Sequence, residues 1–338
     1  MNLYTIEEYV LNRYNASSKA REDVSSIVLS CGFKSAAKND KSKLKGGKIR
    51  KILLTLSVYF KLLKTLEKDD VLFLQTSSVV LKGILRIKGI KKFQIIYLIH
   101  DIFPIRYDDV DAHAEEIFRE LSLINQCEYV ICHNEKMKER LITLGCTSKI
   151  YCLNIFDYLV DDASNIRERD PNGRTVAFAG NLSKSRFLNV LDEKCFDVKI
   201  NVYGLPETKY SSLQYMGSLP AEQLPYKIEG NFGLIWEGGY QMTDKDNYLR
   251  YNNPHKASLY IVSGLPLIVW DRSAIADFVT KNRIGITISS LDELALKIGC
   301  ISSSEYEELV SNCLSLRESL ISGNNLKHVL DDIIGGLR

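Results

Sequence analysis

The sequence predicts an α/β protein with two domains, each built on a parallel sheet with helices on both faces. Short, continuously apolar segments alternate with helical patterns in both halves of the chain, which is typical of strands buried on both sides. The length of 338 residues suffices for two separate cores. A polar segment at 161–173, ending in Asp-Pro-Asn-Gly, predicts a linker between the domains.

The N-terminal half contains three predicted strands, at 71–75, 93–99 and 129–132. A helix is expected over about 135–144. Polar residues follow the strands directly, as ligand-binding residues do in open α/β sheets. We place the first domain at residues 1–160.

The C-terminal half repeats this alternation. Its predicted strands are 175–179, 197–203, 232–236 and 267–270. Each strand runs into a loop of Gly, Asn or Asp, and helical segments from about 291 to 337 close the chain. We place the second domain at residues 174–338, with its last helix free to pack back on the first domain.

The segment 252–264 predicts a helix whose start suits a phosphate. Asn253 is a good N-cap, Pro254 suits the first helical position, and Lys256 then falls in the first turn. Free backbone N–H groups, the helix dipole and the ammonium group would all favour an anion there. Gly264 is expected to end the helix. The alternative for Lys256 is a surface lysine without a ligand.

Bulk composition is that of an ordinary globular protein, with 45% apolar and 25% charged residues. No apolar run is long enough to cross a bilayer, and the N-terminus lacks the pattern of a signal peptide. We therefore expect the chain in the cytoplasm. The eight cysteines form no CxxC pair, which favours buried thiols over disulfides or metal ligands.

Basic residues concentrate in residues 41–92, which hold 14 Lys and Arg against three acids. Within it, 48–64 is helical in pattern. The lysines are either simply solvated or belong to a surface that contacts anionic lipid heads or an anionic acceptor. Nucleic acid is not expected, because the chain shows none of the usual nucleic-acid-binding signatures.

The run 252–260, followed by Leu265-Pro266, Trp270-Asp271 and 282–285, resembles the bacterial β-1,6-galactofuranosyltransferases of O-antigen and surface-polysaccharide assembly. Further matching blocks lie in the same order along the chain, at 18–23, 98–102, 132–134, 155–160, 179–183, 232–237 and 276–278. A more distant resemblance is to the glucosyltransferases of streptococcal adhesins. Both imply a GT-B fold of two Rossmann-like domains facing across a cleft, a UDP-sugar donor, and no metal or other cofactor.

One departure from GT-B relatives concerns stereochemistry. Many retaining members carry a Glu in the helix before the Gly-x-Pro, where it holds the ribose of the donor. Here 258–264 contains no acid. The resemblance therefore implies an inverting enzyme.

The resemblance also implies a donor site in the second domain. Its expected residues are Gly180, Asn181, Tyr203, Gly204, Asn253, His255 and Lys256. A glycine at the end of a strand lets the backbone approach a phosphate, although it also suits a tight turn. Tyr203 would cover the uracil or else belong to the core, and His255 would contact the nucleotide or cap the helix.

Asp101 is the candidate general base, because an inverting transfer needs a group that takes the proton of the acceptor hydroxyl. The structural alternative is that Asp101 caps a helix over 102–104. His100 would assist or point into the sheet. Rival carboxylates lie at 108–111, and with His113 they resemble either a metal cluster or an acidic helix start.

Lys19 and Arg21 near the start of the first helix would bind an anionic part of the acceptor, or be solvated.

The sequence thus predicts an inverting enzyme that moves a sugar, with galactofuranose as the first choice, from UDP to a hydroxyl of a surface glycan. UDP-glucose is the alternative donor, and a sugar-nucleotide epimerase or a non-catalytic glycan or nucleotide binder are the alternative classes. The acceptor is a glycan, with a lipid-linked form as one option. Peripheral contact of 41–92 with the inner face of the cell membrane and a homo-oligomer are further expectations.

Overall fold

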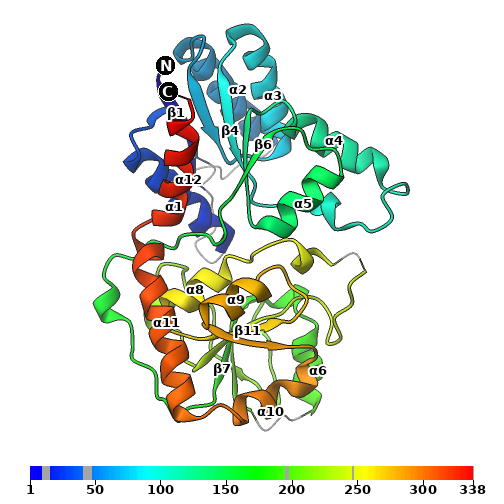
Figure 1. Ribbon diagram of the computed structural model, residues 1–338, viewed down its shortest axis with the longest axis vertical. Coiled ribbons are helices and arrows are strands. Elements are labelled where there is room, and N and C mark those ends of the chain that lie inside the picture. The colour runs from blue at the N-terminus through cyan, green and yellow to red at the C-terminus, as the bar shows by residue number, and fades with distance from the viewer. Residues whose placement is uncertain (10–15, 41–47, 195–197, 246, 338) are drawn as a thin grey trace. The chain divides into compact units, whose positions relative to one another are not determined.

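The computed structural model describes residues 1–9, 16–40, 48–194, 198–245 and 247–337. The chain divides into two compact units. Unit 1 comprises Met1–Asn12, Ser17–Asn154 and Gly323–Arg338, and unit 2 comprises Arg13–Ala16 and Ile155–Ser322. Each unit is an α/β structure with a parallel sheet, as the sequence predicts (Figure 1). The expected cleft between the two domains stays a prediction.

The sheet of unit 1 has the strand order β2-β1-β3-β4-β5-β6, and its strands pair in parallel. The strands are β1 (Leu3–Tyr9), β2 (Lys34–Asp40), β3 (Val71–Leu74), β4 (Gln94–Leu98), β5 (Tyr129–Cys132) and β6 (Lys149–Cys152). The three predicted strands are confirmed as β3, β4 and β5. The strands β1 and β2 went unpredicted because they carry polar and charged residues at many positions, and the four-residue strand β6 also went unpredicted.

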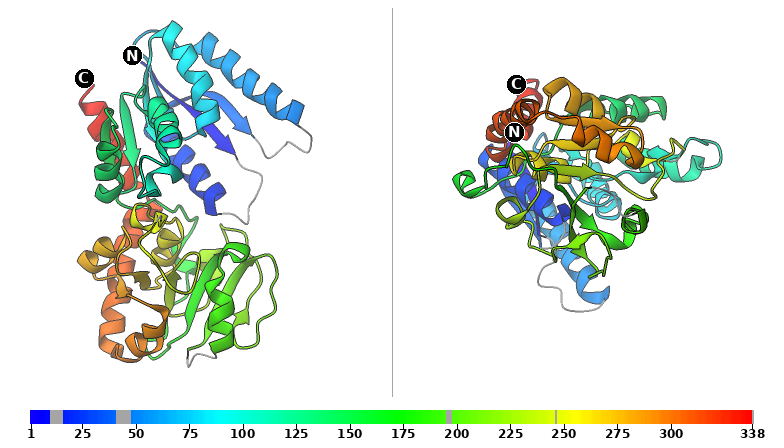
Figure 2. Two further views of the ribbon diagram at one scale, coloured as in Figure 1. Left: turned by 90° about the vertical axis from the view of Figure 1, so that its right-hand side faces the viewer. Right: turned by 90° about the horizontal axis from the view of Figure 1, so that it is seen from below.

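Helices flank this sheet on both faces (Figures 1 and 2). They are α1 (Ala16–Ser30), α2 (Lys48–Thr65), α3 (Ser78–Lys91), the 3-10 helix η1 (Phe103–Arg106), α4 (Ala114–Ile124), α5 (Glu135–Thr143) and α12 (Asn324–Gly335). The helix expected over 135–144 is confirmed as α5, and the side chain of Asn134 accepts a hydrogen bond from Met137 N at 2.9 Å to cap it.

The sheet of unit 2 has the order β12-β11-β10-β7-β8-β9 and is also parallel. Its strands are β7 (Val176–Asn181), β8 (Ile200–Leu205), β9 (Gln214–Tyr215), β10 (Phe232–Ile235), β11 (Leu267–Trp270) and β12 (Gly285–Ile288). The four predicted strands correspond to β7, β8, β10 and β11. The short strands β9 and β12 went unpredicted.

Helices of unit 2 cover both faces of its sheet (Figure 1). They are α6 (Phe187–Lys194), α7 (Leu224–Lys227), α8 (Lys256–Val262), α9 (Ala276–Asn282), α10 (Leu294–Gly299) and α11 (Ser303–Ile321). Single-turn 3-10 helices lie at Ala163–Asn165 (η2), Leu182–Lys184 (η3), Tyr248–Arg250 (η4) and Leu291–Glu293 (η5). Two apolar clusters, one on each side of the sheet, form the core.

The polar segment 161–173 is not the free linker that its composition suggests. It belongs to unit 2, and Arg169 anchors it there. The guanidinium of Arg169 donates to Ser263 O at 2.6 and 3.0 Å and to Ile228 O at 3.0 Å. Burial lowers the pKa of Arg169 to about 10. The boundary between the units along the chain lies between residues 154 and 155 rather than at 160. The last helix, α12, belongs to unit 1.

The predicted helix start at 253–256 needs a correction. Helix α8 begins at Lys256, and His255 rather than Asn253 occupies the N-cap position. The carbonyl of Pro254 already accepts from Ala257 N at 2.9 Å, in the tighter i to i+3 pattern, so the regular α-helix starts two residues later than expected. The predicted stop is confirmed, since Gly264 has φ +69° and Leu265 N donates back to Tyr260 O at 2.8 Å.

The anchoring role of Arg169 is testable by unfolding in urea. We expect Arg169→Met to lower the free energy of unfolding by roughly 3 kcal/mol, because it leaves two buried carbonyls without donors. Arg167→Met is the matched control, since Arg167 pairs with Glu229 at 2.9 Å on the exposed surface. The control should lose less than about 1 kcal/mol. Equal losses in the two variants would contradict this account.

Candidate active site

The first half of the candidate site lies at the switch point of the sheet in unit 2. The chain proceeds from β7 to β8 and β9 on one side, and from β10 to β11 and β12 on the other, so β7 and β10 are the neighbours at which the order reverses. Ligands of open α/β sheets bind at the carboxyl ends of the strands at this position.

Lys256 brings a positive charge to this switch point. Its ammonium group donates to Trp236 O, directly after β10, at 3.3 Å and lies 4.8 Å from the centre of the ring of Phe178 in β7. Desolvation by burial lowers the pKa of Lys256, while the nearby Glu237 acts in the opposite direction. An ammonium group with so little compensation is well suited to receive an anion.

Two paired glycines shape the backbone toward the carboxyl ends of β7 and β8. Gly180 at the end of β7 lies opposite Gly204 in β8. Gly204 has φ +147°, and a Cβ placed on it would lie 1.9 Å from Gly180 O, so only glycine fits there. The side chain of Asn181 accepts from Ser183 N at 3.0 Å and from Ser183 Oγ at 2.7 Å, which fixes the turn after β7.

The remaining predicted donor residues are placed as follows. The imidazole of His255 stacks on Tyr158 with 5.1 Å between ring centres, rather than capping α8. Asn253 is buried. Tyr203 is also buried, and its hydroxyl accepts from Glu229 N at 2.8 Å, so it has the core position that was its structural alternative. A nucleotide contact of these three residues stays a prediction.

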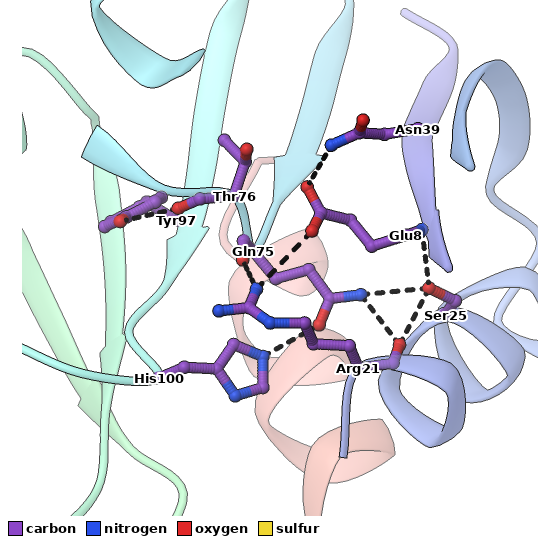
Figure 3. Close-up of polar contacts among 8 residues, drawn as sticks. All are labelled: Glu8, Arg21, Ser25, Asn39, Gln75, Thr76, Tyr97 and His100. Atoms are coloured by element: carbon purple, nitrogen blue, oxygen red, sulfur yellow. Dashed lines mark hydrogen bonds and ion pairs between the residues drawn. The ribbon is translucent and has the colours of Figure 1, made fainter. Parts of the chain in front are cut away.

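The second half of the candidate site lies at the switch point of the sheet in unit 1, between β1 and β3. Glu8 near the end of β1 lies 3.6 Å from a guanidinium nitrogen of Arg21 on α1 and accepts from Asn39 Nδ2 at 3.1 Å. Arg21 also donates to the backbone carbonyl of Gln75, which directly follows β3. Figure 3 shows Asn39 joined to Glu8, Glu8 to Arg21, and Arg21 to the backbone of Gln75. Arg21 is therefore part of a buried network rather than a solvated helix charge.

Gln75 orients the imidazole of His100. The amide nitrogen of Gln75 donates to Arg21 O and Ser25 Oγ, both at 2.9 Å, which fixes the orientation of its side chain. The amide oxygen must then accept from His100 Nε2, 2.8 Å away (Figure 3). From this we assign the proton of a neutral His100 to Nε2, which leaves Nδ1 as an acceptor.

Asp101 follows His100 and is exposed. The short helix η1 begins at Phe103, and Ile102 rather than Asp101 occupies its N-cap position. On helix α1, Lys19 forms an ion pair with Asp23. The catalytic role of Asp101 stays a prediction.

The segment 108–113 is neither an acidic helix start nor an obvious metal centre. Helix α4 begins at Ala114, and its first-turn acids are Glu115 and Glu116. Asp109 instead accepts from Ala112 N at 3.0 Å, and His113 stacks on Tyr107. Across the described ranges, no group of three or more His, Cys, Asp or Glu side chains is arranged to hold a metal ion. Independence of metal stays a prediction.

Comparisons with known proteins identify the family. The N-terminal domain of the Glucosyltransferase 3-like family matches residues 3–155, and its C-terminal domain matches residues 176–333. The chain belongs to this family. It is also 29% identical over 343 residues to the β-1,6-galactofuranosyltransferase WbbI of Escherichia coli K12, covering 99% of both chains. The resemblance seen in the sequence is thereby confirmed.

Solved structures show the same fold. Sucrose-phosphate synthase from Thermosynechococcus elongatus superposes with a TM-score of 0.65 at 10% identity over 99% of both chains. Anabaena HepE in complex with UDP-glucose gives 0.61 at 12% identity, covering 99% of this chain and 100% of its own. The predicted GT-B fold is confirmed. As a family member the chain is a glycosyltransferase, which sets aside the epimerase and the non-catalytic binder.

Sequence reasoning missed Glu8, Asn39 and Gln75 at the switch point of unit 1. Glu8 lies in a strand whose polar residues hide it from an apolar pattern, and Asn39 lies in a second such strand. Gln75 was included in a predicted strand but not considered for function. A polar residue directly after a buried strand, as Gln75 is, was the available signal.

Removal of the Gln75 side chain tests the network in this glycosyltransferase. We expect Gln75→Met to lower the free energy of unfolding by about 2 kcal/mol, because the variant loses the hydrogen bonds of the Gln75 amide to Arg21 O, Ser25 Oγ and His100 Nε2. The control is Gln126→Met, since Gln126 donates to Ser122 O at 2.7 Å on the exposed surface. It should change stability by less than about 0.5 kcal/mol. A Gln75 variant as stable as the control would sink this assignment.

Proposed function

We propose that the chain is an inverting glycosyltransferase that moves galactofuranose from UDP-galactofuranose to a hydroxyl of a surface-glycan acceptor. The observation that carries the donor half is the ammonium group of Lys256 at the switch point of the sheet in unit 2. The match to a galactofuranosyltransferase over 99% of both chains supports the sugar. UDP-glucose is the second candidate donor, favoured by the family description and by the UDP-glucose complex of HepE.

Lys256 would bind the diphosphate and stabilise the charge that builds up on it as the bond to the sugar breaks. Gly180 and Gly204 would let the backbone come close to the same group. No metal is proposed, because the lysine supplies positive charge where the diphosphate leaves. Asn181, Tyr203, Asn253 and His255 complete the proposed donor site.

Asp101 would act as the general base. It would take the proton from the acceptor hydroxyl while the oxygen attacks the anomeric carbon and the bond to UDP breaks, which inverts the configuration. The absence of an acid in 258–264 supports inversion, since no carboxylate stands where many retaining relatives hold the ribose. His100, oriented by Gln75, lies next to Asp101 in sequence and would assist it.

We further propose a cytoplasmic reaction on a glycan acceptor, with a lipid-linked form as the first one to test. An assay of UDP release with UDP-galactofuranose and UDP-glucose would separate the two donors. Nuclear magnetic resonance of the product would give the anomeric configuration, and a retained configuration would contradict the proposed mechanism.

Loss of the charge on Lys256 should weaken binding of UDP. We expect Lys256→Met to raise the dissociation constant about 10- to 100-fold by calorimetry, the range of a charge-assisted hydrogen bond. Lys281→Met, at an exposed position of α9, is the control and should bind as the parent does. Because burial lowers the pKa of Lys256, affinity of the parent should begin to fall at a pH below the ordinary lysine value of 10.5. Unchanged affinity in Lys256→Met would refute the donor site.

Loss of the carboxylate of Asp101 should affect turnover and not donor binding. We expect Asp101→Asn to lower kcat by roughly 10²- to 10⁴-fold, the usual contribution of a general base, with an unchanged dissociation constant for UDP. Asp109→Asn is the control, since Asp109 accepts a local hydrogen bond from Ala112 N at 3.0 Å. If Asp101→Asn keeps ordinary turnover while His100→Gln loses it, the base is His100.

A further inference from the structure

An apolar stripe runs along the outer face of α2 in unit 1. Six large apolar side chains of this helix are exposed, at fractions of 37–74%: Ile49, Ile52, Leu53, Leu56, Phe60 and Leu63. Their spacing of three and four residues places them on one face of the helix. A single exposed apolar side chain is ordinary, but a continuous row of them indicates an interaction surface.

The opposite face of α2 already fills the core of unit 1. Val58 and Leu62, half a turn away from the stripe, are buried. The hydroxyl of Tyr59 donates to Val80 O of α3 at 3.2 Å, and its ring covers Gly83, where a Cβ would lie 2.2 Å from the ring. Helix α2 thus packs against α3 and β2 (Figure 2). The exposed stripe lies on the helix face opposite the buried Val58 and Leu62.

Positive charges border the stripe on both sides. Lys61 and Lys64 are exposed along one edge, and the ammonium of Lys64 lies 4.5 Å from the ring centre of Phe60. Across the other edge, Arg86 of α3 is exposed and close enough to Tyr59 to oppose the rise that burial causes in the pKa of its hydroxyl. The sequence of α2 contains no Asp or Glu.

We propose that the outer face of α2 lies on the surface of an anionic lipid bilayer. The stripe would enter the boundary between headgroups and acyl chains, and the flanking Lys and Arg would contact anionic headgroups. Charge complementarity selects this occupant. A second copy packed stripe to stripe would bring rows of like charge together without an acid on either helix. A soluble anionic glycan would match the charges but leave the stripe in water.

This surface is peripheral. Among the described residues, no helix is both long and apolar enough to pass through a membrane. The inference rests on unit 1 alone and does not depend on the donor or on the chemistry proposed above.

The test is co-sedimentation of the full chain with vesicles of phosphatidylglycerol and phosphatidylethanolamine, compared with vesicles of phosphatidylcholine alone. We expect binding to the anionic vesicles only, and a decrease with rising salt. Phe60→Gln combined with Leu53→Gln and Leu56→Gln should reduce the bound fraction at least about tenfold. Lys61→Gln with Lys64→Gln should also weaken binding and flatten its dependence on salt.

The control is Phe118→Gln. Phe118 is an exposed phenylalanine on helix α4 of unit 1, outside the stripe, and it is 73% exposed against 59% for Phe60. It should bind vesicles as the parent does, and all variants should keep the parent's circular dichroism and affinity for UDP. Equal binding to neutral vesicles, or full binding by the triple variant, overturns the proposal. A parent protein that does not bind the vesicles also overturns the proposal. If light scattering then gives a smaller mass for the stripe variant than for the parent, the stripe is an interface between copies of the chain.

Discussion

The position of the lysine charge in unit 2 depends on how one buried tyrosine packs. The ring of Tyr260 on α8 lies directly on Gly233 of β10, where a Cβ would lie 2.2 Å from the ring. Its hydroxyl accepts from Ala179 N in β7 at 2.8 Å. One side chain therefore fixes α8 across the two strands at which the sheet reverses its order. Because Lys256 is the first residue of this helix, its ammonium group lies 3.3 Å from Trp236 O, directly after β10, and 4.8 Å from the ring centre of Phe178 in β7.

Both sheets reverse their strand order at one pair of neighbouring strands, but the charges at the two positions differ. In unit 2, Lys256 is desolvated and donates to a single backbone carbonyl, so the local charge is poorly compensated and favours an anion. In unit 1, Glu8 and Arg21 face each other within a network of neutral amides. In that network the charges of Glu8 and Arg21 are paired, and Gln75 orients His100 in the loop after β4 by a hydrogen bond. The charge in unit 2 suits the proposed donor site, whereas the network in unit 1 orients His100.

The two faces of helix α2 differ: one packs in the core of unit 1, and the other is exposed and apolar. Its inner face contributes buried residues, whereas its outer face carries apolar groups that contribute nothing to the core of unit 1. The proposed contact with a bilayer would remove these apolar groups from water.

The sequence by itself determined the two α/β units and most of the buried strands, because a strand covered on both faces must be continuously apolar. It also determined the end of α8 at Gly264, since a left-handed cap is a local demand on the backbone. It did not reveal β1, whose polar residues are stabilised by partners distant in the chain. Only the tertiary structure decided which strands are neighbours, and hence that Lys256 and Gln75 lie at the two switch points. Strand order follows from long-range packing, which no local pattern encodes.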